Sequence, residues 1–511
     1  MDVLGILTVP GWLVTTLLCV LTLVMYSVYC LTHFWRLGIP GPRPTLFLGS
    51  FATFIKKGVF GTDMEFSQKY GKFYGVYAGN LPTVMVSDVD IIKQICIKDF
   101  STYPNRVPLG MNNDPVLKGG MSMARDDHWK FIRTVISPTF SSGKMRHMTP
   151  LLQICIEDLI TKLKKDTENG DAVDICTYCG SYSMDVIAST AFGMNVDAQN
   201  SSDNAFVKNA KAAFQIGLTN PFVLIIIFFP FTRKLLPYLN VSTFPKSVVN
   251  FFTTAVASVI EDRKSEKTVR QDLLGLMLNA HKDTEKEESK VELKNANRMD
   301  FVKRPLTDQE ILANALIFLL AGYETTANVL AFVIYCMALY PEYADRLRSE
   351  VDEEVGQDKP TYDNVSKLQY LDMFVSEVLR LYGSAVRFNR IAEEDVVING
   401  YLIPKGTDIQ FPITVIHRDA TLWPDPEVFD PERFTPENKA KRHPYAWIPF
   451  GVGPRNCVGM RFALTELKMA AVAILQNFIA LRSEDTEVPI TFHKGGFLKA
   501  ANGIKLKLQR R

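Results

Sequence analysis

The run Phe450-Gly451-Val452-Gly453-Pro454-Arg455-Asn456-Cys457-Val458-Gly459 joins a glycine-rich loop to the start of an amphipathic helix. Cys457 lies at the junction, where the free N–H groups and partial positive charge of a helix N-terminus favour a thiolate over a thiol. Gly451 and Gly453 permit a positive φ, so backbone amides can approach the sulfur closely. Arg455 is placed to pair with an anion beside the sulfur. This combination indicates a cysteine that ligates a haem iron and an arginine that binds a haem propionate.

The alternative for a single cysteine is an ordinary core side chain, because free cysteine behaves as a small hydrophobe. The surrounding pattern, Phe-x-x-Gly-x-Arg-x-Cys-x-Gly, favours the iron ligand. It resembles the haem-binding signature of the cytochrome P450 family. The resemblance implies haem b as the cofactor, Cys457 as its axial iron ligand, and Arg455 and Phe450 as further haem contacts.

Composition is that of a large globular protein, with 511 residues, 47% hydrophobic and 22% charged. The net charge of +2 gives no indication of a nucleic-acid partner. The eight cysteines are scattered, which fits a reducing compartment better than a disulfide framework. The pair Cys176 and Cys179 lacks the second pair or the histidines of a zinc site, so we interpret both as core residues.

The N-terminal segment is apolar, with no charged side chain from Val3 to Tyr29. Such a length suffices for a spanning helix of about 20 residues. A cleaved signal peptide is the alternative, but it would carry basic residues before the apolar run. Here Arg36 and Arg43 follow it, which predicts a retained single-pass anchor at residues 1–35 with a lumenal N-terminus. Everything after the anchor is then expected in the cytosol, on the endoplasmic reticulum membrane.

Residues 36–50 contain Leu37-Gly38-Ile39-Pro40-Gly41-Pro42-Arg43-Pro44, whose prolines forbid a continuing helix. They predict a hinge before a catalytic domain at 51–511, and this segment resembles the proline-rich hinge of microsomal P450s. Short β-branched segments such as 83–86 predict a small sheet near the N-terminus, and helical periodicity dominates from about Asp88. The expected fold is mainly α with a smaller β region.

Trp129 and Arg133 lie four residues apart and therefore share a helix face. Without further context, this pair predicts a tryptophan packed on an arginine stem. The family resemblance implies instead a helix that donates to a haem propionate. It implies further propionate contacts from Arg106 and Arg390.

Two segments have less specific patterns. Pro221 to Phe231 is too short to span a bilayer, so it is either a buried core segment or, as the resemblance implies, a surface segment that dips into the membrane. His281 to Arg304 mixes lysines and acids, which predicts an exposed loop.

A long apolar helix is predicted from Ile311 to about Tyr340, after a capping box at Thr307 to Glu310. It would be about 45 Å long and could cross a whole domain. A second membrane span is the alternative, but polar residues within it, including Glu324 and Thr325, argue against lipid contact.

The middle of this helix reads Ala321-Gly322-Tyr323-Glu324-Thr325-Thr326. Gly322 lets a flat cofactor approach the helix backbone, and Thr325 can bond back to the carbonyl of Ala321. An acid beside an alcohol also makes a proton relay. The sequence resembles the oxygen-activation motif of P450s, which implies that Thr325 and Glu324 are catalytic.

Glu377 and Arg380 share a face of an otherwise apolar helix. The usual interpretation is a surface ion pair worth under about 1 kcal/mol. The resemblance implies a buried network of Glu377, Arg380 and Arg433 that supports the haem-binding core. Gly383 departs from the family, in which proline is usual, and is expected to loosen residues 384–388.

After Ala392, alternating residues and turns at Asn399-Gly400 and Lys405-Gly406 predict the smaller β region. Gly495 to Leu498 resembles the hairpin that enters the pocket from the C-terminal side. The resemblance implies a substrate pocket formed by Phe318, Ala321, Ala385, Val386, Phe497 and Leu498.

Three segments resemble the family-3 (3A-like) branch of P450s, namely Ser137 to Phe140, Ala321 to Thr326 and Met460 to Ala463. The resemblance implies a haem-thiolate monooxygenase that acts on steroids, drugs and other lipophilic compounds. Its electrons would come from an NADPH-dependent reductase of the same membrane, with a cytochrome b-type protein as a possible second donor, since the chain has no flavin or dinucleotide fingerprint. Two other functions stay open: a haem-thiolate isomerase that rearranges peroxides, and a non-catalytic haem binder or sensor.

Overall fold

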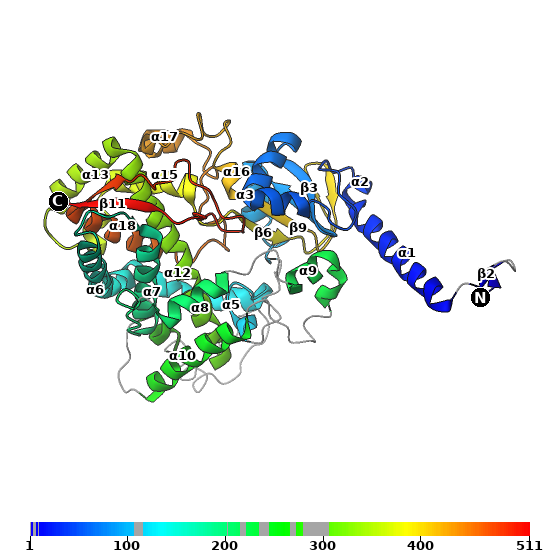
Figure 1. The fold of residues 1–511 in the computed structure, drawn as a ribbon, viewed down its shortest axis with the longest axis horizontal. Coiled ribbons are helices and arrows are strands. Elements are labelled where there is room, and N and C mark those ends of the chain that lie inside the picture. Colours follow the sequence, from blue (N-terminus) through cyan, green and yellow to red (C-terminus); the bar gives the residue numbers. More distant parts are fainter. Residues whose placement is uncertain are drawn as a thin grey trace, which may run out of the picture.

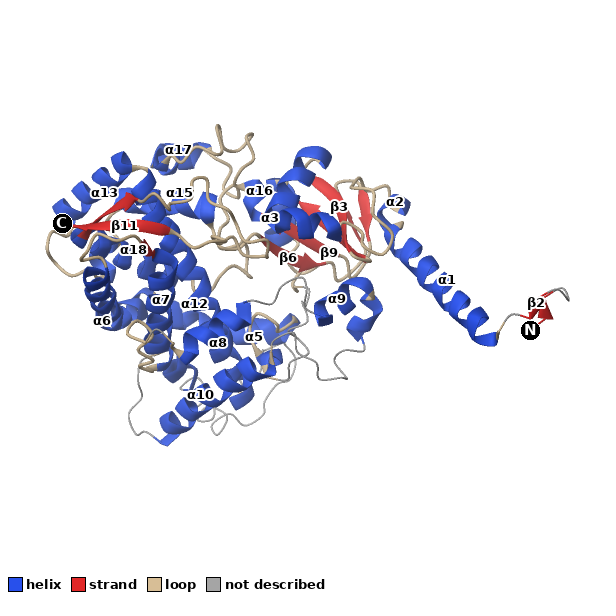
Figure 2. Ribbon diagram, viewed as in Figure 1, coloured by secondary structure: helices blue, strands red, loops and turns tan. Residues whose placement is uncertain are grey.

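The computed structural model describes residues 2–3, 7–8, 10–106, 116–201, 203–214, 221–234, 245–265, 272–278 and 306–511, and its helices dominate (Figures 1 and 2). The helices are α1 (Gly11–Leu31), α2 (His33–Arg36), α3 (Phe51–Tyr70), α4 (Val89–Lys93), α5 (Asp126–Ile136), α6 (Ser142–Asp166), α7 (Ile175–Phe192), α8 (Ala205–Phe214), α9 (Pro221–Phe228), α10 (Lys246–Ser265), α12 (Asp308–Leu339), α13 (Pro341–Glu354), α14 (Tyr362–Val365), α15 (Gln369–Tyr382), α16 (Ile413–Ile416), α17 (Pro436–Lys441) and α18 (Met460–Asn477). The predicted fold class, mainly α with a smaller β region, is confirmed.

The strands are β1 (Asp2–Val3), β2 (Leu7–Thr8), β3 (Phe73–Ala78), β4 (Leu81–Val86), β5 (Val173–Asp174), β6 (Arg387–Ile391), β7 (Val396–Ile398), β8 (Tyr401–Ile403), β9 (Asp408–Pro412), β10 (Phe478–Arg482) and β11 (Lys505–Arg510). The largest sheet has the order β3-β4-β9-β6; only β4 and β9 pair in parallel, with Thr83 opposite Asp408. It lies on the side of the molecule that carries α1, and most of the helices lie on the other side (Figure 2). The β7–β8 hairpin turns at Asn399-Gly400, as predicted.

Helix α12 runs through the helical part, and α7, α15 and α18 pack against it. It begins with the predicted capping box: the Glu310 N–H donates to Thr307 Oγ1 (3.2 Å), and Thr307 N–H donates to Glu310 Oε2 (2.8 Å). Among the described helices, α1 and α12 are long and apolar enough to cross a membrane, but 61% of the best window of α12 is buried, against 6% for α1. Helix α12 is therefore the core helix, and α1 is the exposed candidate anchor.

Helix α1 projects away from the body of the protein (Figure 1). The proline-rich segment after it packs against β3 instead of standing free. The Gly75 N–H donates to Pro40 O (2.8 Å), and a Cβ on Gly41 would lie 2.1 Å from Gly75 O. Residues 36–50 thus connect the anchor to the sheet through a tight backbone contact.

The apolar segment Pro221 to Phe231 forms α9 and the start of a 3-10 turn, η5 (Pro230–Lys234), on the surface beside α1. The rings of Tyr26 and Phe231 meet edge to face at 5.7 Å, and Asn80 Nδ2 donates to Phe228 O (2.8 Å). Ile226 is buried, whereas Phe231 is 54% exposed. The segment is therefore buried on one side and open on the side next to the anchor. The predicted loop at 281–304 lies outside the described residues.

Candidate functional site

The loop before α18 holds Cys457 by a turn that requires glycine. The Cys457 N–H donates to Phe450 O (2.8 Å), and Gly451 and Gly453 have φ values of 71° and 77°. A Cβ on Gly453 would lie 2.1 Å from Cys96 O. Gly453 is therefore needed both for its backbone conformation and for the close approach of the loop to residue 96.

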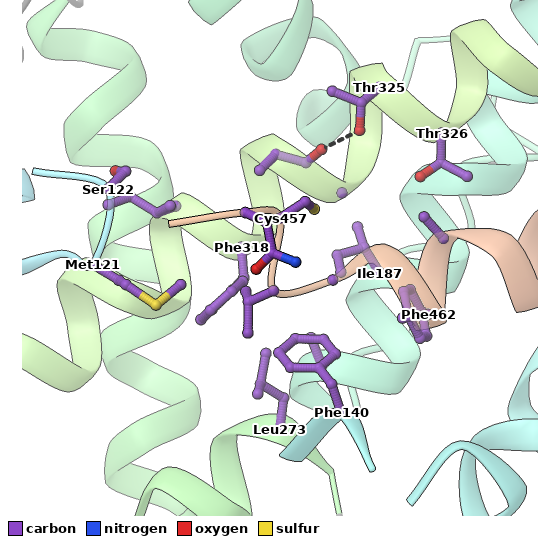
Figure 3. Close-up of a pocket in the computed structure, with 18 of the residues that line it drawn as sticks. Met121, Ser122, Phe140, Ile187, Leu273, Phe318, Thr325, Thr326, Cys457 and Phe462 are labelled. Carbon is purple, nitrogen blue, oxygen red and sulfur yellow. Dashed lines mark hydrogen bonds between the residues drawn. The ribbon is translucent and has the colours of Figure 1, made fainter. Parts of the chain in front are cut away.

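Cys457 faces a cavity whose space not filled by protein atoms is about 1030 Å³ (Figure 3). Part of this space is open to solvent, and the volume that water-sized molecules can occupy is about 230 Å³. Helix α12 contributes Phe318, Ala321, Gly322 and Thr325 to the wall. The same helix also contributes Ile317 and Thr326. The remaining lining is mostly apolar and comes from other parts of the chain: Arg106, Met121, Ser122, Trp129, Arg133, Phe140, Met148, Ile187, Thr190, Ala191, Leu273, Arg455, Asn456, Val458, Gly459, Phe462 and Ala463.

Burial raises the pKa of the Cys457 thiol, while the Gly459 N–H and then Arg133 and Arg106 lower it. The start of the helix therefore stabilises the thiolate in the predicted direction, but burial has the larger effect. A coordinated metal ion deprotonates a thiol outright, which would reverse that balance. In the described residues no group of three or more His, Cys, Asp or Glu side chains is placed to hold a bare ion. A metal at Cys457 would thus need its other ligands from a prosthetic group.

Four arginines surround the Cys457 loop, each bonded to backbone. Arg106 Nη2 donates to Arg455 O (2.8 Å), Arg133 Nη1 to Asn456 O (2.9 Å), Arg455 Nε to Pro104 O (2.7 Å) and Arg390 Nη1 to Asn389 O (2.8 Å). Within the described chain none of the four forms an ion pair with a carboxylate.

Burial, followed by repulsion from the neighbouring guanidinium groups, lowers the pKa of Arg106 to about 10 and that of Arg455 to about 8. The Nε atoms of Arg106 and Arg390 are buried without a hydrogen-bond partner. Buried cations that repel one another and retain free donors need an anion. The two propionates of haem b fit this donor set, and Cys457 beside it fits the iron.

Trp129 is buried on α5, and Arg455 Cζ lies 4.2 Å from the centre of its ring. Tryptophan does pack on an arginine, as the sequence pattern predicts, but the partner is Arg455 from the distant loop. Arg133, one turn further along α5, reaches Asn456 beside the cysteine. The roles of Trp129, Arg133, Arg106, Arg390 and Arg455 as haem contacts stay predictions.

Thr325 lines the cavity, and its Oγ1 donates to Ala321 O (2.6 Å), as the sequence predicts (Figure 3). Gly322 lines the cavity, and its role toward a cofactor stays a prediction; a Cβ there would also lie 2.8 Å from Ile187 Cδ1. Its missing side chain admits helix α7. Glu324 is not among the cavity-lining residues, because its carboxylate pairs with Lys499 Nζ at 2.8 Å.

The predicted substrate pocket is divided in this structure. Phe318 and Ala321 line the cavity with Cys457. Ala385, Val386, Phe497 and Leu498 do not; they form a second group, in which Ala385 bridges to Phe497 and the Leu498 N–H donates to Ser384 O (2.8 Å).

Residues 384–388 are held more firmly than Gly383 led us to expect. Ser384 Oγ donates to Thr325 O (3.0 Å), and the Ile413 N–H donates to Val386 O (2.9 Å). Gly383 has a φ of −57°, which proline also adopts, and a Cβ there would lie 2.5 Å from Leu379 O. The glycine relieves a contact at the end of α15.

The predicted Glu377–Arg380–Arg433 network is present. Arg380 donates from Nε and Nη2 to the Glu377 carboxylate at 2.7 and 2.8 Å, and Arg433 Nε lies 3.5 Å from Glu377 Oε1. Glu377 and Arg380 are fully buried, so this is not the surface pair that spacing alone suggests. Arg380 also donates to His417 O (2.8 Å).

His417 was not singled out by the sequence. It is 1% exposed and accepts from the Ile448 N–H at Nε2 (2.9 Å), so its Nδ1 carries the proton that bonds Arg380 O (3.1 Å). Burial and the nearby Arg380 lower its pKa to about 3. This neutral histidine links the network to the loop of Cys457. In the sequence, the one sign of this role is a single histidine directly after the apolar run 413–416.

Comparison with known proteins gives a family model described as "Cytochrome P450" that matches residues 39–508. Cytochrome P450 3A7 of Homo sapiens is 40% identical over 518 residues, covering 100% of this chain and 99% of the relative. Cytochrome P450 3A29 of Sus scrofa is 39% identical, covering 99% and 98%, and cytochrome P450 3A13 of Mus musculus is 38% identical, covering 100% and 99%.

Proposed function

The chain belongs to the cytochrome P450 family and is a haem b monooxygenase of lipophilic substrates, steroids and xenobiotics among them, and we propose which of its residues bind the haem and which transfer protons. Cys457 would hold the haem iron through its thiolate, and Arg106, Arg133, Arg390 and Arg455 would hold the propionates. The bound haem supplies the activation of O2, which thiolate ligation favours by donating electron density to the iron. The observation that carries this assignment is the single cavity faced by Cys457 and Thr325.

Thr325 controls protons on the cavity side of α12. While its hydroxyl donates to Ala321 O, the oxygen lone pairs remain free to accept a bond from a group in the cavity. Donation into the cavity requires the hydroxyl to rotate away from Ala321. Threonine is suited to both states, since its oxygen is fixed close to the helix backbone.

Glu324 supplies protons to Thr325 from the side of Lys499. The Lys499 side chain is 35% exposed, whereas that of Glu324 is 14% exposed. The ion pair thus stands between solvent and the turn of α12 that carries Thr325. Apolar residues such as Phe318 and Phe140 keep bulk water from the cavity, so proton entry is confined to the polar side.

The reaction consumes electrons, and the family implies a redox partner reductase. We assign this role to the NADPH-dependent flavin reductase of the same membrane, with a cytochrome b-type protein as a second donor. An N-terminal apolar helix is present, as in microsomal members of the family. Residues 1–35 are assigned as a single-pass anchor, 36–50 as the connection, and 51–511 as a cytosolic catalytic domain. The open side of α9 beside α1 would contact the lipid surface.

The test is Thr325→Ala in the haem-loaded protein with reductase, comparing product and hydrogen peroxide per NADPH. We expect the haem to stay bound and peroxide to replace product, because the variant lacks a directed proton source. Thr62→Ala is the matched control: Thr62 Oγ1 makes the same backbone bond, to Gly58 O at 2.6 Å, far along the chain in α3. If Thr325→Ala and the parent form equal amounts of product per NADPH, the role of Thr325 is refuted. Turnover without NADPH would instead indicate a peroxide isomerase.

A further inference from the structure

Helix α18, which begins three residues after Cys457, carries a buried acid that the reaction described above does not use. Glu466 is 1% exposed and lies on the side of α18 that faces α7. Its carboxyl group contacts Ser183 Oγ at 3.1 Å. In the described part of the chain, no lysine, arginine or histidine pairs with it.

The contacts of Ser183 show which form of Glu466 is present. Ser183 Oγ lies 3.1 Å from Glu466 Oε1 and 3.2 Å from Gly322 O. A hydroxyl has one proton to donate, and an ionised carboxylate has none. With an ionised Glu466, Ser183 would have to share its one proton between two acceptors. Two full hydrogen bonds form when a protonated Glu466 donates to Ser183 and Ser183 donates to Gly322. Burial also raises the pKa of Glu466 well above its ordinary value, and Ser183 opposes this only partly.

The chain of bonds ends at the turn of α12 that lines the cavity. Gly322 follows Ala321, whose carbonyl accepts the bond from Thr325. Gly322 and Thr325 both face the cavity of Cys457. Glu466 and Ser183 therefore connect α18 through α7 to α12, in an interface whose other members are largely apolar.

We propose that Glu466 carries a proton in the working enzyme and, with Ser183, acts as a positioning residue that sets the Gly322–Thr325 turn of α12 relative to α18. The proposal rests on the roles proposed for Cys457 and Thr325. A neutral acid suits this place, because an unpaired carboxylate would be strongly destabilised by burial. A bond through one hydroxyl fixes direction and distance, which apolar packing alone specifies less closely.

The first experiment tests the proton on Glu466 without reference to activity. Infrared spectra of the haem-loaded parent and Glu466→Gln are subtracted at neutral pH, in water and in heavy water. We expect a carbonyl band of a protonated carboxylic acid that is present only in the parent and moves in heavy water. In Ser183→Ala the band should persist at a shifted frequency, since the acid loses its acceptor. A difference spectrum without this band would overturn the proposal.

The second experiment tests positioning, by product formed per NADPH. Glu466→Gln should keep the parent value, because its amide can still donate to Ser183. Glu466→Met and Ser183→Ala should each lower it about fivefold, the factor of one hydrogen bond of average strength. The apparent KM and the thiolate-type carbon monoxide spectrum should not change.

Ser189→Ala is the matched control on α7, since Ser189 Oγ donates to Val186 O of its own helix (3.1 Å) and contacts Cys155 Sγ of α6 (3.6 Å). Ser189→Ala should form as much product per NADPH as the parent protein. The double variant Glu466→Met/Ser183→Ala should lose no more coupling than Ser183→Ala alone, because both act through one connection. The positioning role is refuted if Ser183→Ala forms as much product per NADPH as the parent. It is also refuted if Glu466→Gln lowers product per NADPH as much as Glu466→Met does. If the infrared band is present but Thr325→Ala stays coupled, the role of Thr325 fails while the protonated state of Glu466 stands.

Discussion

Replacing Arg380 by leucine tests whether the buried network holds the haem-binding core together. The guanidinium makes two bonds to Glu377 and also donates to the carbonyls of His417 (2.8 Å), Pro426 (2.7 Å) and Val428 (3.1 Å). Both charged side chains are 0% exposed. The variant would leave the buried Glu377 carboxylate with Arg433 at 3.5 Å as its remaining cation, and the carbonyls of His417 and Pro426 without the Arg380 donor.

Breaking a buried ion pair by removing one partner typically costs about 3–5 kcal/mol, and each unsatisfied buried carbonyl adds about 1 kcal/mol unless water reaches it. Arg433 remains near Glu377, so we take the lower end of the ion-pair range, about 3 kcal/mol, and add about 1 kcal/mol for each of the two carbonyls. The expected loss of about 5 kcal/mol is a third or more of the usual stability of a domain, about 5–15 kcal/mol. The matched control is Arg346→Leu, because Arg346 pairs with Glu432 at 2.8 Å with side chains that are 55% and 42% exposed. That exposed pair is expected to contribute under about 1 kcal/mol.

The measurement is urea unfolding of the haem-loaded proteins, followed by tryptophan fluorescence and by haem absorption. If Arg380→Leu does not accumulate as folded protein, the loss in free energy of unfolding is measured on Glu377→Gln instead. This variant keeps the side-chain shape and removes one charge. A parent-like midpoint for both variants, or an effect no larger than that of Arg346→Leu, would show that the network is not structural.

Four further predictions follow from individual contacts. Cys457→His should abolish monooxygenation and the strongly red-shifted carbon monoxide complex, and a retained shift would identify another ligand. Lys499→Met should lower product per NADPH by at most about fivefold by freeing Glu324, and Lys499→Arg should restore it, as expected for a pair worth up to about 1 kcal/mol. Folded His417 stays neutral down to about pH 3, whereas the unfolded residue binds a proton near pH 6.5. The free energy of unfolding should therefore fall, below pH 6.5, by up to about 1.4 kcal/mol per pH unit. The variant His417→Gln should make this fall less steep. Glycosidase treatment should not change the mobility of the microsomal protein, since its Asn-x-Ser sequons would face the cytosol; a shift would reverse the topology.

Several features could be predicted because neighbouring residues determine them. The capping box of Thr307 and Glu310, the bond from Thr325 to Ala321 and the turn at Cys457 each close within a few residues, so local backbone geometry is sufficient. The apolar length of α1 and the polar interruptions of α12 likewise separate the exposed helix from the buried one.

Other features could not be predicted, because the partner comes from elsewhere in the chain. Gly322 lines the cavity, but that its missing side chain also makes room for Ile187 of α7 could not be known from the sequence. Gly383 was expected to loosen the chain, but bonds to Ile413 and Leu498 hold the following segment. The position of Glu324 depends on Lys499, which lies 175 residues away in the sequence.

The sequence by itself indicated the residues to which we assign the chemistry: the thiol at 457, the alcohol at 325, and the arginines that can bind an anion. Only the tertiary structure decided that Arg106, Arg133, Arg390 and Arg455 converge on one loop. The same holds for the proton that we propose on Glu466, which is argued from one hydroxyl lying between a carboxyl group and a carbonyl on different helices. The physical reason is that a side chain's type and its helix or loop are local properties, whereas its burial, its partners and hence its protonation depend on helices that packing brings together.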